Sequence, residues 1–303
     1  MVIKSNPMQE ISYNGFKCTI ICGDSREVLQ NFNSQADLIV TSPPYADARK
    51  KHYDSIKPDD YSDWFMTFHE PFYNSLTSNG SLVINIKDKV ENGVRNRYVW
   101  QTILNLSNNG WNSIDDYIWC KPNPMPGYWP TRLSDGWEYC FHLAKTTQPL
   151  FNRNEIKKPI GNWVKSRLKN LPESDLSRHN STNESGFGRD ISKWLGKEEV
   201  LPSNVLNIPL VGKNKGHPAV FPTELPLFFI KLLCPPGGTV IDPFAGSGTT
   251  GVAALLSGRN CILVDNNSNY CQEAFERINS ELLIKVDQPE FLFTNSDLSL
   301  KQE

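Results

Sequence analysis

The chain has 303 residues, 39% of them hydrophobic and 21% charged, with a formal net charge of −2 at pH 7. This is the composition of a soluble globular protein long enough for a substantial core, and the charge gives no general attraction for nucleic acid. Seven cysteines without a CxxC pair favour a reduced, cytoplasmic protein over a disulfide framework or a zinc site. Neither a secretory signal nor a membrane span is expected.

Apolar runs alternate with helical periodicity along the chain, which predicts a doubly wound α/β sheet. Helices are expected at Tyr61–Ser75, at Glu224–Leu233 with Thr223 as N-cap, and at Gly251–Ser257. Residues 112–123 and 136–146 are predicted to form an antiparallel hairpin at a sheet edge. The runs typical of buried parallel strands are Cys18–Cys22, Asp37–Val40, Ser81–Ile86, Thr239–Ile241 and Cys261–Val264.

A glycine loop follows the strand predicted over 239–241. Gly246, Gly248 and Gly251 match GxGxxG, and Asp265 lies about 20 residues after the first of these glycines, as in dinucleotide sites. Glycines admit close approach of a ligand, the helix N-terminus offers free N–H groups, and Asp265 can accept from ribose hydroxyls. No lysine follows the glycines, so the loop is not an ATP-type P-loop. An adenosine cofactor is expected, with structural packing as the alternative.

Asp242, which ends that strand, helps to distinguish between the possible adenosine cofactors. Its carboxylate would repel a pyrophosphate and attract a cationic sulfonium or amino group, which disfavours NAD. The chain beyond Asp242 has room for only two strands, so the rest of the sheet precedes it and the fold is circularly permuted. In a sheet of order 3-2-1-4-5, strand 239–241 then neighbours strand 37–40 at the switch point where ligands bind.

The turn Ser42-Pro43-Pro44-Tyr45 would therefore face the glycine loop. Its two prolines end the strand and hold the turn rigid. The Ser42 hydroxyl and the Pro43 carbonyl can accept both hydrogens of an exocyclic amine, and so aim its lone pair at a methyl group. Tyr45 offers a face on which a flipped-out base can stack.

These motifs, in this order, resemble those of the β group of S-adenosylmethionine-dependent DNA amino-methyltransferases. The resemblance covers GDS (Gly23–Ser25), TSPPY (Thr41–Tyr45), HPAVFP (His217–Pro222) and DPFAGSGTT (Asp242–Thr250), with a variable region between. It implies a class I methyltransferase sheet, S-adenosylmethionine as cofactor and duplex DNA as substrate. Ser-Pro-Pro-Tyr is typical of N4-cytosine enzymes and Asp- or Asn-Pro-Pro-Tyr of N6-adenine enzymes. The family often has Glu where Asp265 stands.

The site expected from the residues and the resemblance has two parts. The catalytic residues are Ser42, Pro43, Pro44 and Tyr45, and neither a metal ion nor a general base of unusual pKa is required. C5-cytosine methylation is excluded because no cysteine follows a proline. The expected cofactor-binding residues are Asp24, facing the adenine amino group, with Ser25, His217, Phe221, Asp242, Pro243, Phe244, Ala245, Gly246, Ser247, Gly248, Thr249, Asp265 and Asn266.

A basic segment interrupts the predicted sheet. Residues 145–216 hold 13 lysines and arginines against seven acidic residues, a net charge of +6 that leaves −8 for the remainder. We predict a target-recognition region at 146–216, between a catalytic half (1–145) and a cofactor-binding half (217–286), with a polar tail at 287–303. Arg132 and Glu138 shape either the base pocket or only the hairpin. The expected DNA contacts are Arg49, Lys50, Lys51, Arg132, Lys165, Arg167 and Lys169.

Several functions remain open at this point. N6-adenine methylation shares nearly every motif, and a methyltransferase for RNA or protein glutamine shares most of them. An NAD-dependent oxidoreductase shares the glycine loop, and a non-catalytic DNA-binding module would need no cofactor pocket. The restriction-modification context of the family would supply a cognate endonuclease that acts on the same DNA site without direct contact. The recognition sequence and the oligomeric state are not predicted.

Overall fold

The computed structural model describes residues 8–47, 56–124, 126–127, 129–162, 166, 169, 196–210 and 222–287. Contacts divide the chain into a main unit, Met1–Asn152 with Ser203–Glu290, and a second unit that includes Arg153–Pro202. The described part of the second unit holds a short 3₁₀ helix, η2 (Arg153–Ile156), and an antiparallel pair of strands, β9 (Lys158–Pro159) and β10 (Glu199–Val200). The fold and the candidate site described below belong to the main unit.

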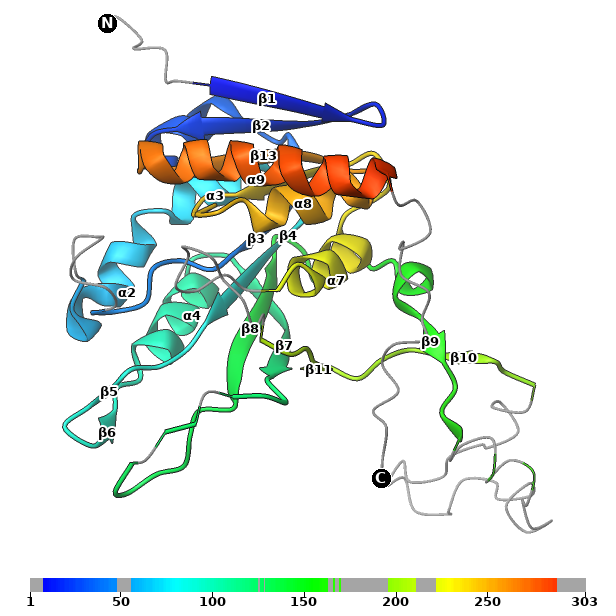
Figure 1. Ribbon diagram of the computed structural model, residues 1–303. Coiled ribbons are helices and arrows are strands. Elements are labelled where there is room, and N and C mark those ends of the chain that lie inside the picture. The colour runs from blue at the N-terminus through cyan, green and yellow to red at the C-terminus, as the bar shows by residue number, and fades with distance from the viewer. Residues whose placement is uncertain are drawn as a thin grey trace, which may run out of the picture. The chain divides into compact units, whose positions relative to one another are not determined.

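The described residues of the main unit form a nine-stranded sheet in the order β1-β2-β13-β12-β3-β4-β8-β7-β11 (Figure 1). Its strands are β1 (Met8–Tyr13), β2 (Phe16–Cys22), β3 (Ala36–Thr41), β4 (Leu76–Ile86), β7 (Asn112–Cys120), β8 (Trp137–Ala144), β11 (Val205–Asn207), β12 (Thr239–Asp242) and β13 (Asn260–Asp265). The five strands from β2 to β4 are parallel, and β12 pairs with β3. The predicted 3-2-1-4-5 order and the circular permutation are confirmed.

Both edges of this sheet differ from the sequence-based expectation. β7 and β8 form the predicted antiparallel hairpin, but β11 pairs in parallel with β7, so the hairpin is not the edge. At the other edge, β1 pairs antiparallel with β2 through Asn14 and Gly15, whose φ angles are 48° and 85°. Two positive φ angles in a two-residue loop are typical of a type I′ turn, for which Asn-Gly is favoured.

The helices of the main unit form two groups (Figure 1). Helix α8 contacts both α7 and α9, and α9 also contacts β2 and β13. Helix α2 contacts α3 and α4, and α3 also contacts β4. A separate pair of short strands, β5 (Val90–Glu91) and β6 (Val94–Arg95), follows β4. The helix bounds are α1 (Ser25–Val28), η1 (Leu29–Asn31), α2 (Pro58–Met66), α3 (His69–Ser75), α4 (Tyr98–Asn108), α7 (Glu224–Leu233), α8 (Thr249–Leu256) and α9 (Ser268–Asp287).

The single helix predicted over Tyr61–Ser75 is wrong, because α2 ends at Met66 and α3 begins at His69. Pro71 explains the break: in a continuous helix its ring would clash with the carbonyl of Thr67, and it has no N–H to donate there. The helix predicted over Glu224–Leu233 is confirmed. Thr223 is its N-cap by position, although its side chain makes no capping hydrogen bond.

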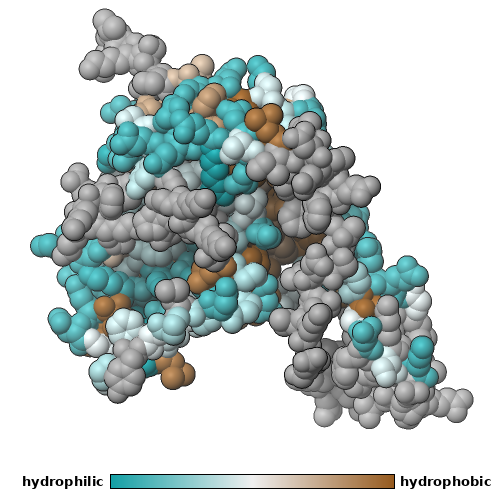
Figure 2. Space-filling model, viewed as in Figure 1, coloured by the Kyte–Doolittle hydropathy of each residue, from teal (hydrophilic) through white to brown (hydrophobic). Residues whose placement is uncertain are grey.

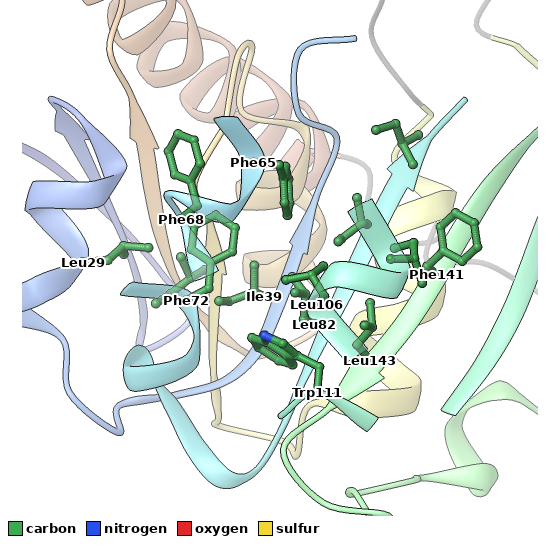
Figure 3. Packing of buried hydrophobic residues seen from close by; sticks show 14 of the residues in the cluster. Leu29, Ile39, Phe65, Phe68, Phe72, Leu82, Leu106, Trp111, Phe141 and Leu143 are labelled. Carbon is green, nitrogen blue, oxygen red and sulfur yellow. The ribbon is translucent and has the colours of Figure 1, made fainter. Parts of the chain in front are cut away.

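Aromatic side chains from α2 and α3 pack against the apolar strands to form the hydrophobic core (Figure 3). Phe65 and Phe72 are fully buried, and each contributes roughly 1.5–3 kcal/mol through removal from water. Phe68 extends the cluster to Phe244, which follows β12; their ring centroids are 5.0 Å apart in an edge-on contact. The core therefore supports the loop that carries DPF.

The face of the molecule in Figure 2 is largely hydrophilic over the described residues, and its hydrophobic residues lie in small separate spots. None of the helices within the described ranges has the length and apolar character needed to cross a membrane.

Candidate active site

Three of the sequence motifs meet at the carboxyl edge of the parallel strands. Thr41 is the last residue of β3, and its hydroxyl donates to Oδ1 of Asp242, the last residue of β12, over 2.7 Å. The Ser25 hydroxyl, beyond β2, donates to the Pro243 carbonyl over 2.5 Å. The turn after β3, the GDS segment and the DPF loop thus form one hydrogen-bonded edge.

Asp242 is completely buried and fully bonded by its own chain. Besides Thr41, the Thr250 hydroxyl donates to its Oδ2 over 2.6 Å and the Phe244 N–H donates to its Oδ1 over 3.1 Å. Burial raises the pKa of Asp242 to about 6, although these hydrogen bonds oppose the rise. When ionised, this carboxylate acts on the site through its electric field, because its oxygens already bind Thr41, Phe244 and Thr250.

The three glycines of the GxGxxG loop have different roles. Gly246 has φ +50°, and no atom lies within 4 Å of where its Cβ would be. A Cβ on Gly248 would lie 2.9 Å from the Ala274 Cβ, and one on Gly251 would lie 2.8 Å from Ile278 Cδ1. Gly248 and Gly251 therefore let α9 pack closely, as the structural alternative expects, while Gly246 leaves open space beside the loop.

Arg277 on α9, which the sequence analysis did not identify, holds the side chains of the same loop. Its Nη1 donates to Ser247 Oγ and Thr249 Oγ1, both at 2.8 Å. Its Nε pairs with Glu281 at 2.6 Å. The hydroxyls expected to contact a cofactor are thus engaged by α9, and their structural role is to fix the loop's shape.

Asp265 ends β13 and is also buried. Its Oδ2 accepts from the Gly246 N–H and its Oδ1 from the Asn267 N–H, both over 2.9 Å. Burial raises the pKa of this carboxyl above its usual value. The neighbouring predicted residue, Asn266, is exposed. The short Asp265 side chain therefore accepts hydrogen bonds from the backbone of Gly246 and Asn267. The longer Glu that is common in the family would extend further.

Asp24 caps the N-terminus of α1, with its Oδ1 accepting from the Arg26 N–H over 2.8 Å. The Arg26 guanidinium also binds both carboxylate oxygens of Asp24. This hydrogen-bonded pairing lowers the pKa of Asp24. An adenine amino group at this carboxylate would share it with Arg26.

The Ser42–Tyr45 turn is held in place by hydrogen bonds and by packing against the hydrophobic core. The Tyr61 hydroxyl donates to the Pro44 carbonyl over 2.9 Å. The Tyr45 ring packs against the hydrophobic core, and its hydroxyl donates to Glu138 Oε2 over 2.8 Å. Ser42 Oγ lies 3.4 Å from the Tyr45 hydroxyl oxygen.

Glu138 on β8 is buried and forms an ion pair with Lys121 at 2.5 Å. The Lys121 ammonium also lies 4.4 Å from the centre of the Trp119 ring. Burial, and then the charge of Glu138, raise the pKa of Tyr45 well above its usual value. The sequence analysis named Glu138 without fixing its role and missed Lys121. A signal was available for Glu138, which is an acidic residue in the largely apolar strand β8, whereas Lys121 follows the end of β7 and had none.

The expected DNA contacts are only partly within the described residues. Arg132 lies in the connection between β7 and β8, with its guanidinium 4.2 Å from the centre of the Trp129 ring and 3.4 Å from Asp135. Arg95 and Lys87 also pair with Asp135, so three cations surround one carboxylate. Lys169 is exposed. The expected residues that lie outside the described ranges are Arg49, Lys50, Lys51, Lys165, Arg167, His217 and Phe221.

Solved structures similar to this chain agree with the fold. The PvuII DNA methyltransferase (cytosine-N4-specific) is 25% identical with a TM-score of 0.65, covering 93% of this chain and 95% of its own. The M1.HpyAVI–SAM complex is 22% identical with a TM-score of 0.53, covering 86% of this chain and 99% of its own. The predicted class I methyltransferase sheet is confirmed.

Sequence relatives and a family model agree with each other. The Type II methyltransferase M.PvuII of Proteus hauseri is 29% identical, covering 86% of this chain and 83% of its own. The Type II methyltransferase M.SmaI of Serratia marcescens is 28% identical, covering 86% and 90%. A family model described as DNA methylase, N6_N4_Mtase, matches residues 36–276. The chain therefore belongs to the N6/N4 DNA methylase family, as its motifs indicated.

Proposed function

We propose that this chain transfers a methyl group from S-adenosylmethionine to N4 of a cytosine in duplex DNA. The observation that carries the proposal is the bond between Thr41 and Asp242, which holds the Ser-Pro-Pro-Tyr turn against the DPF glycine loop. Membership of the DNA methylase family supports the reaction class. The name of its PvuII relative, cytosine-N4-specific, supports the choice of base.

The described residues fit S-adenosylmethionine as cofactor. Gly246 leaves an uncrowded approach to the loop, Phe244 in the same loop is half-buried, and Asp242 favours a positive charge nearby. When bound, the cofactor supplies an electrophilic methyl group on a positively charged sulfur. Asp265 would lie toward its ribose and Asp24 toward its adenine.

The chain's own residues would prepare the target amine. An exocyclic amine is a poor nucleophile while its lone pair is delocalised into the ring. Acceptance of its two hydrogens by Ser42 Oγ and the Pro43 carbonyl would rotate the amine and localise that lone pair. The base must first leave the duplex, and Tyr45 would then stack against it. The methylated amine is cationic and loses a proton to Ser42 or to water.

We further propose that DNA is contacted by the basic region 146–216 and by Arg132 on the β7–β8 connection. The net positive cluster around Asp135 supports a role for the β7–β8 connection in binding DNA phosphates. The enzyme would act in the cytoplasm within a restriction-modification system. Its endonuclease would cut the same sequence when it is unmethylated, without contact between the two proteins.

The decisive test is transfer of tritium from methyl-labelled S-adenosylmethionine to duplex DNA, followed by hydrolysis and identification of the nucleoside. N4-methylcytosine is expected. N6-methyladenine would refute the choice of base while retaining the family's reaction, and absence of transfer from an enzyme that binds the cofactor would refute DNA as substrate.

A further inference from the structure

A chain of polar side chains connects the catalytic turn to the far side of the β7–β8 hairpin. It runs from Ser42 to Tyr45 over 3.4 Å, to Glu138 over 2.8 Å and to Lys121 over 2.5 Å. Its members come from the turn after β3, from β8 and from the residue that follows β7. None of the sequence motifs includes Glu138 or Lys121.

A contribution to stability does not by itself account for the buried ion pair of Glu138 and Lys121. Removing two charges from water costs several kcal/mol per ion, and well-packed apolar residues of similar volume are often at least as stabilising. Glu138 and Lys121 are 6% and 9% exposed. The pair nevertheless lies at the one edge of the sheet where the catalytic turn needs a fixed geometry.

The Glu138 carboxylate sets the direction of every hydrogen bond in this series of four side chains. An ionised carboxylate only accepts and an ammonium only donates. Glu138 Oε1 accepts from Lys121, so the Tyr45 hydroxyl must give its single hydrogen to Oε2. The Tyr45 oxygen can then only accept, and the hydrogen available to it is that of Ser42. With its own hydrogen directed to Tyr45, Ser42 Oγ presents lone pairs elsewhere.

We propose that Glu138, held by Lys121, is a positioning residue that acts through Tyr45 to fix the Ser42 hydroxyl as an acceptor toward the amine of the target base. The inference rests on the proposed function of the Ser42 turn. It assigns the hairpin a task in the methyl-transfer step: without Glu138, the Ser42 hydroxyl can rotate and direct its hydrogen at the amine, where it opposes the bond that the reaction needs.

Glu138→Gln tests the direction of the chain with almost no change in volume. Lys121 requires the single amide oxygen, so the amide nitrogen faces Tyr45 and donates to it. The Tyr45 hydrogen can then go to Ser42 Oγ at 3.4 Å or to Asn85 Oδ1 at 3.5 Å, so the hydroxyl of Ser42 is no longer held as an acceptor toward the amine. We expect kcat to fall on the order of 10²-fold, comparable with the loss of one preorganised partner of the reacting group. The cofactor Kd and the KM for DNA should stay within about threefold, because the Tyr45 ring remains in place.

A second substitution separates hydrogen-bond direction from damage to the fold. In the double variant Lys121→Met with Glu138→Gln, nothing demands the amide oxygen, which can turn to accept from Tyr45. We expect at least about a tenfold recovery of kcat over Glu138→Gln alone, since the original polarity is restored. Tyr45→Phe removes the connection, so adding Glu138→Gln to it should lower kcat no further.

The matched control is another buried carboxylate in an ion pair, Asp88, whose partner is Arg97 at 3.0 Å rather than a residue of the turn. Asp88→Asn should lower the melting temperature and leave kcat near its original value. An active parent enzyme whose kcat is unchanged by Glu138→Gln, or whose loss is not recovered in the double variant, overturns this inference alone. A parent enzyme that methylates no DNA overturns the proposed function, and this inference with it.

Discussion

We predict that cofactor binding depends on pH in a defined direction, because the pKa of Asp242 is raised. Burial lifts this pKa to about 6, so the carboxylate is neutral at lower pH and negative at higher pH. A cationic cofactor favours the negative form, so binding releases a proton and affinity rises as the pH rises through 6. The ionised fraction is about nine-tenths at pH 7 and about one-tenth at pH 5, which makes the affinity about tenfold weaker at the lower pH, or roughly 1.4 kcal/mol.

Isothermal titration calorimetry in buffers of different ionisation enthalpy would measure both the affinity and the proton release. We expect about half a proton released per S-adenosylmethionine near pH 6, and less for S-adenosylhomocysteine, whose sulfur is uncharged. Asp242→Asn should bind weakly and independently of pH. Asp265 also has a raised pKa, so Asp265→Asn is the control: it should bind more weakly at every pH and retain the slope. A flat affinity for the unmodified protein from pH 5 to pH 7 would refute the reasoning.

Asp242 should also affect the stability of the cofactor-free protein. Its folded pKa lies above the ordinary value of 3.8, so its favourable contribution is present in full below that pH and is lost as the pH rises through about 6. Thermal unfolding of the parent protein and of Asp242→Asn across this range tests the sign. The difference between the two melting temperatures should change in favour of Asp242→Asn as the pH rises, and a constant difference contradicts the assignment of the shift to Asp242.

Three other outcomes are expected. Ser42→Ala should leave cofactor affinity nearly intact and lower kcat on the order of 10²-fold. A methyl-transfer rate constant equal to that of the parent enzyme in a single-turnover assay would contradict the acceptor role. Gly246 and Gly248 have left-handed backbones, with φ +50° and +77°, so alanine at either should cost about 1–2 kcal/mol. Gly248→Ala should lower the melting temperature further, because its Cβ would also lie 2.9 Å from that of Ala274, whereas Gly246→Ala meets no atom and should weaken cofactor binding. DNA affinity should fall with salt, and Arg132→Ala should reduce the logarithmic salt slope by about one; an unchanged slope removes Arg132 from the phosphate contacts.

The sequence predicted the centre of the sheet because its strands are buried on both faces and so appear as continuous apolar runs. One wrong prediction and one missed feature had readable local signals: Pro71 interrupts the helix predicted over Tyr61–Ser75, and Asn14-Gly15 is typical of the hairpin turn that was not predicted. The strand β11 had none. Its three residues, Val205–Asn207, pair with β7, and that pairing depends on the folded sheet rather than on the local pattern.

The candidate site was predictable as a set of motifs but not as a set of bonds. The adjacency of the Ser42 turn to Asp242 followed from strand order alone. The partners of Ser247 and Thr249 did not, because Arg277 reaches them from a helix whose packing depends on Gly248 and Gly251. An acidic residue in a largely apolar strand marked Glu138, but its connections to Lys121 and Tyr45 depend on how the strands of the sheet pair. Local sequence patterns predict which residues form the candidate site, whereas the hydrogen-bond partners of those residues depend on tertiary packing.

The short strand β11 has an evolutionary consequence. It returns the chain to the main sheet immediately after Arg153–Pro202, and just before that segment the Asn152 N–H donates to the Leu232 carbonyl over 2.7 Å. The segment thus leaves and rejoins the main unit at two hydrogen-bonded points. Insertions, deletions or wholesale exchange between these points would leave the register of the sheet unchanged. A gene of this design can acquire a new segment by recombination while inheriting its catalytic edge intact.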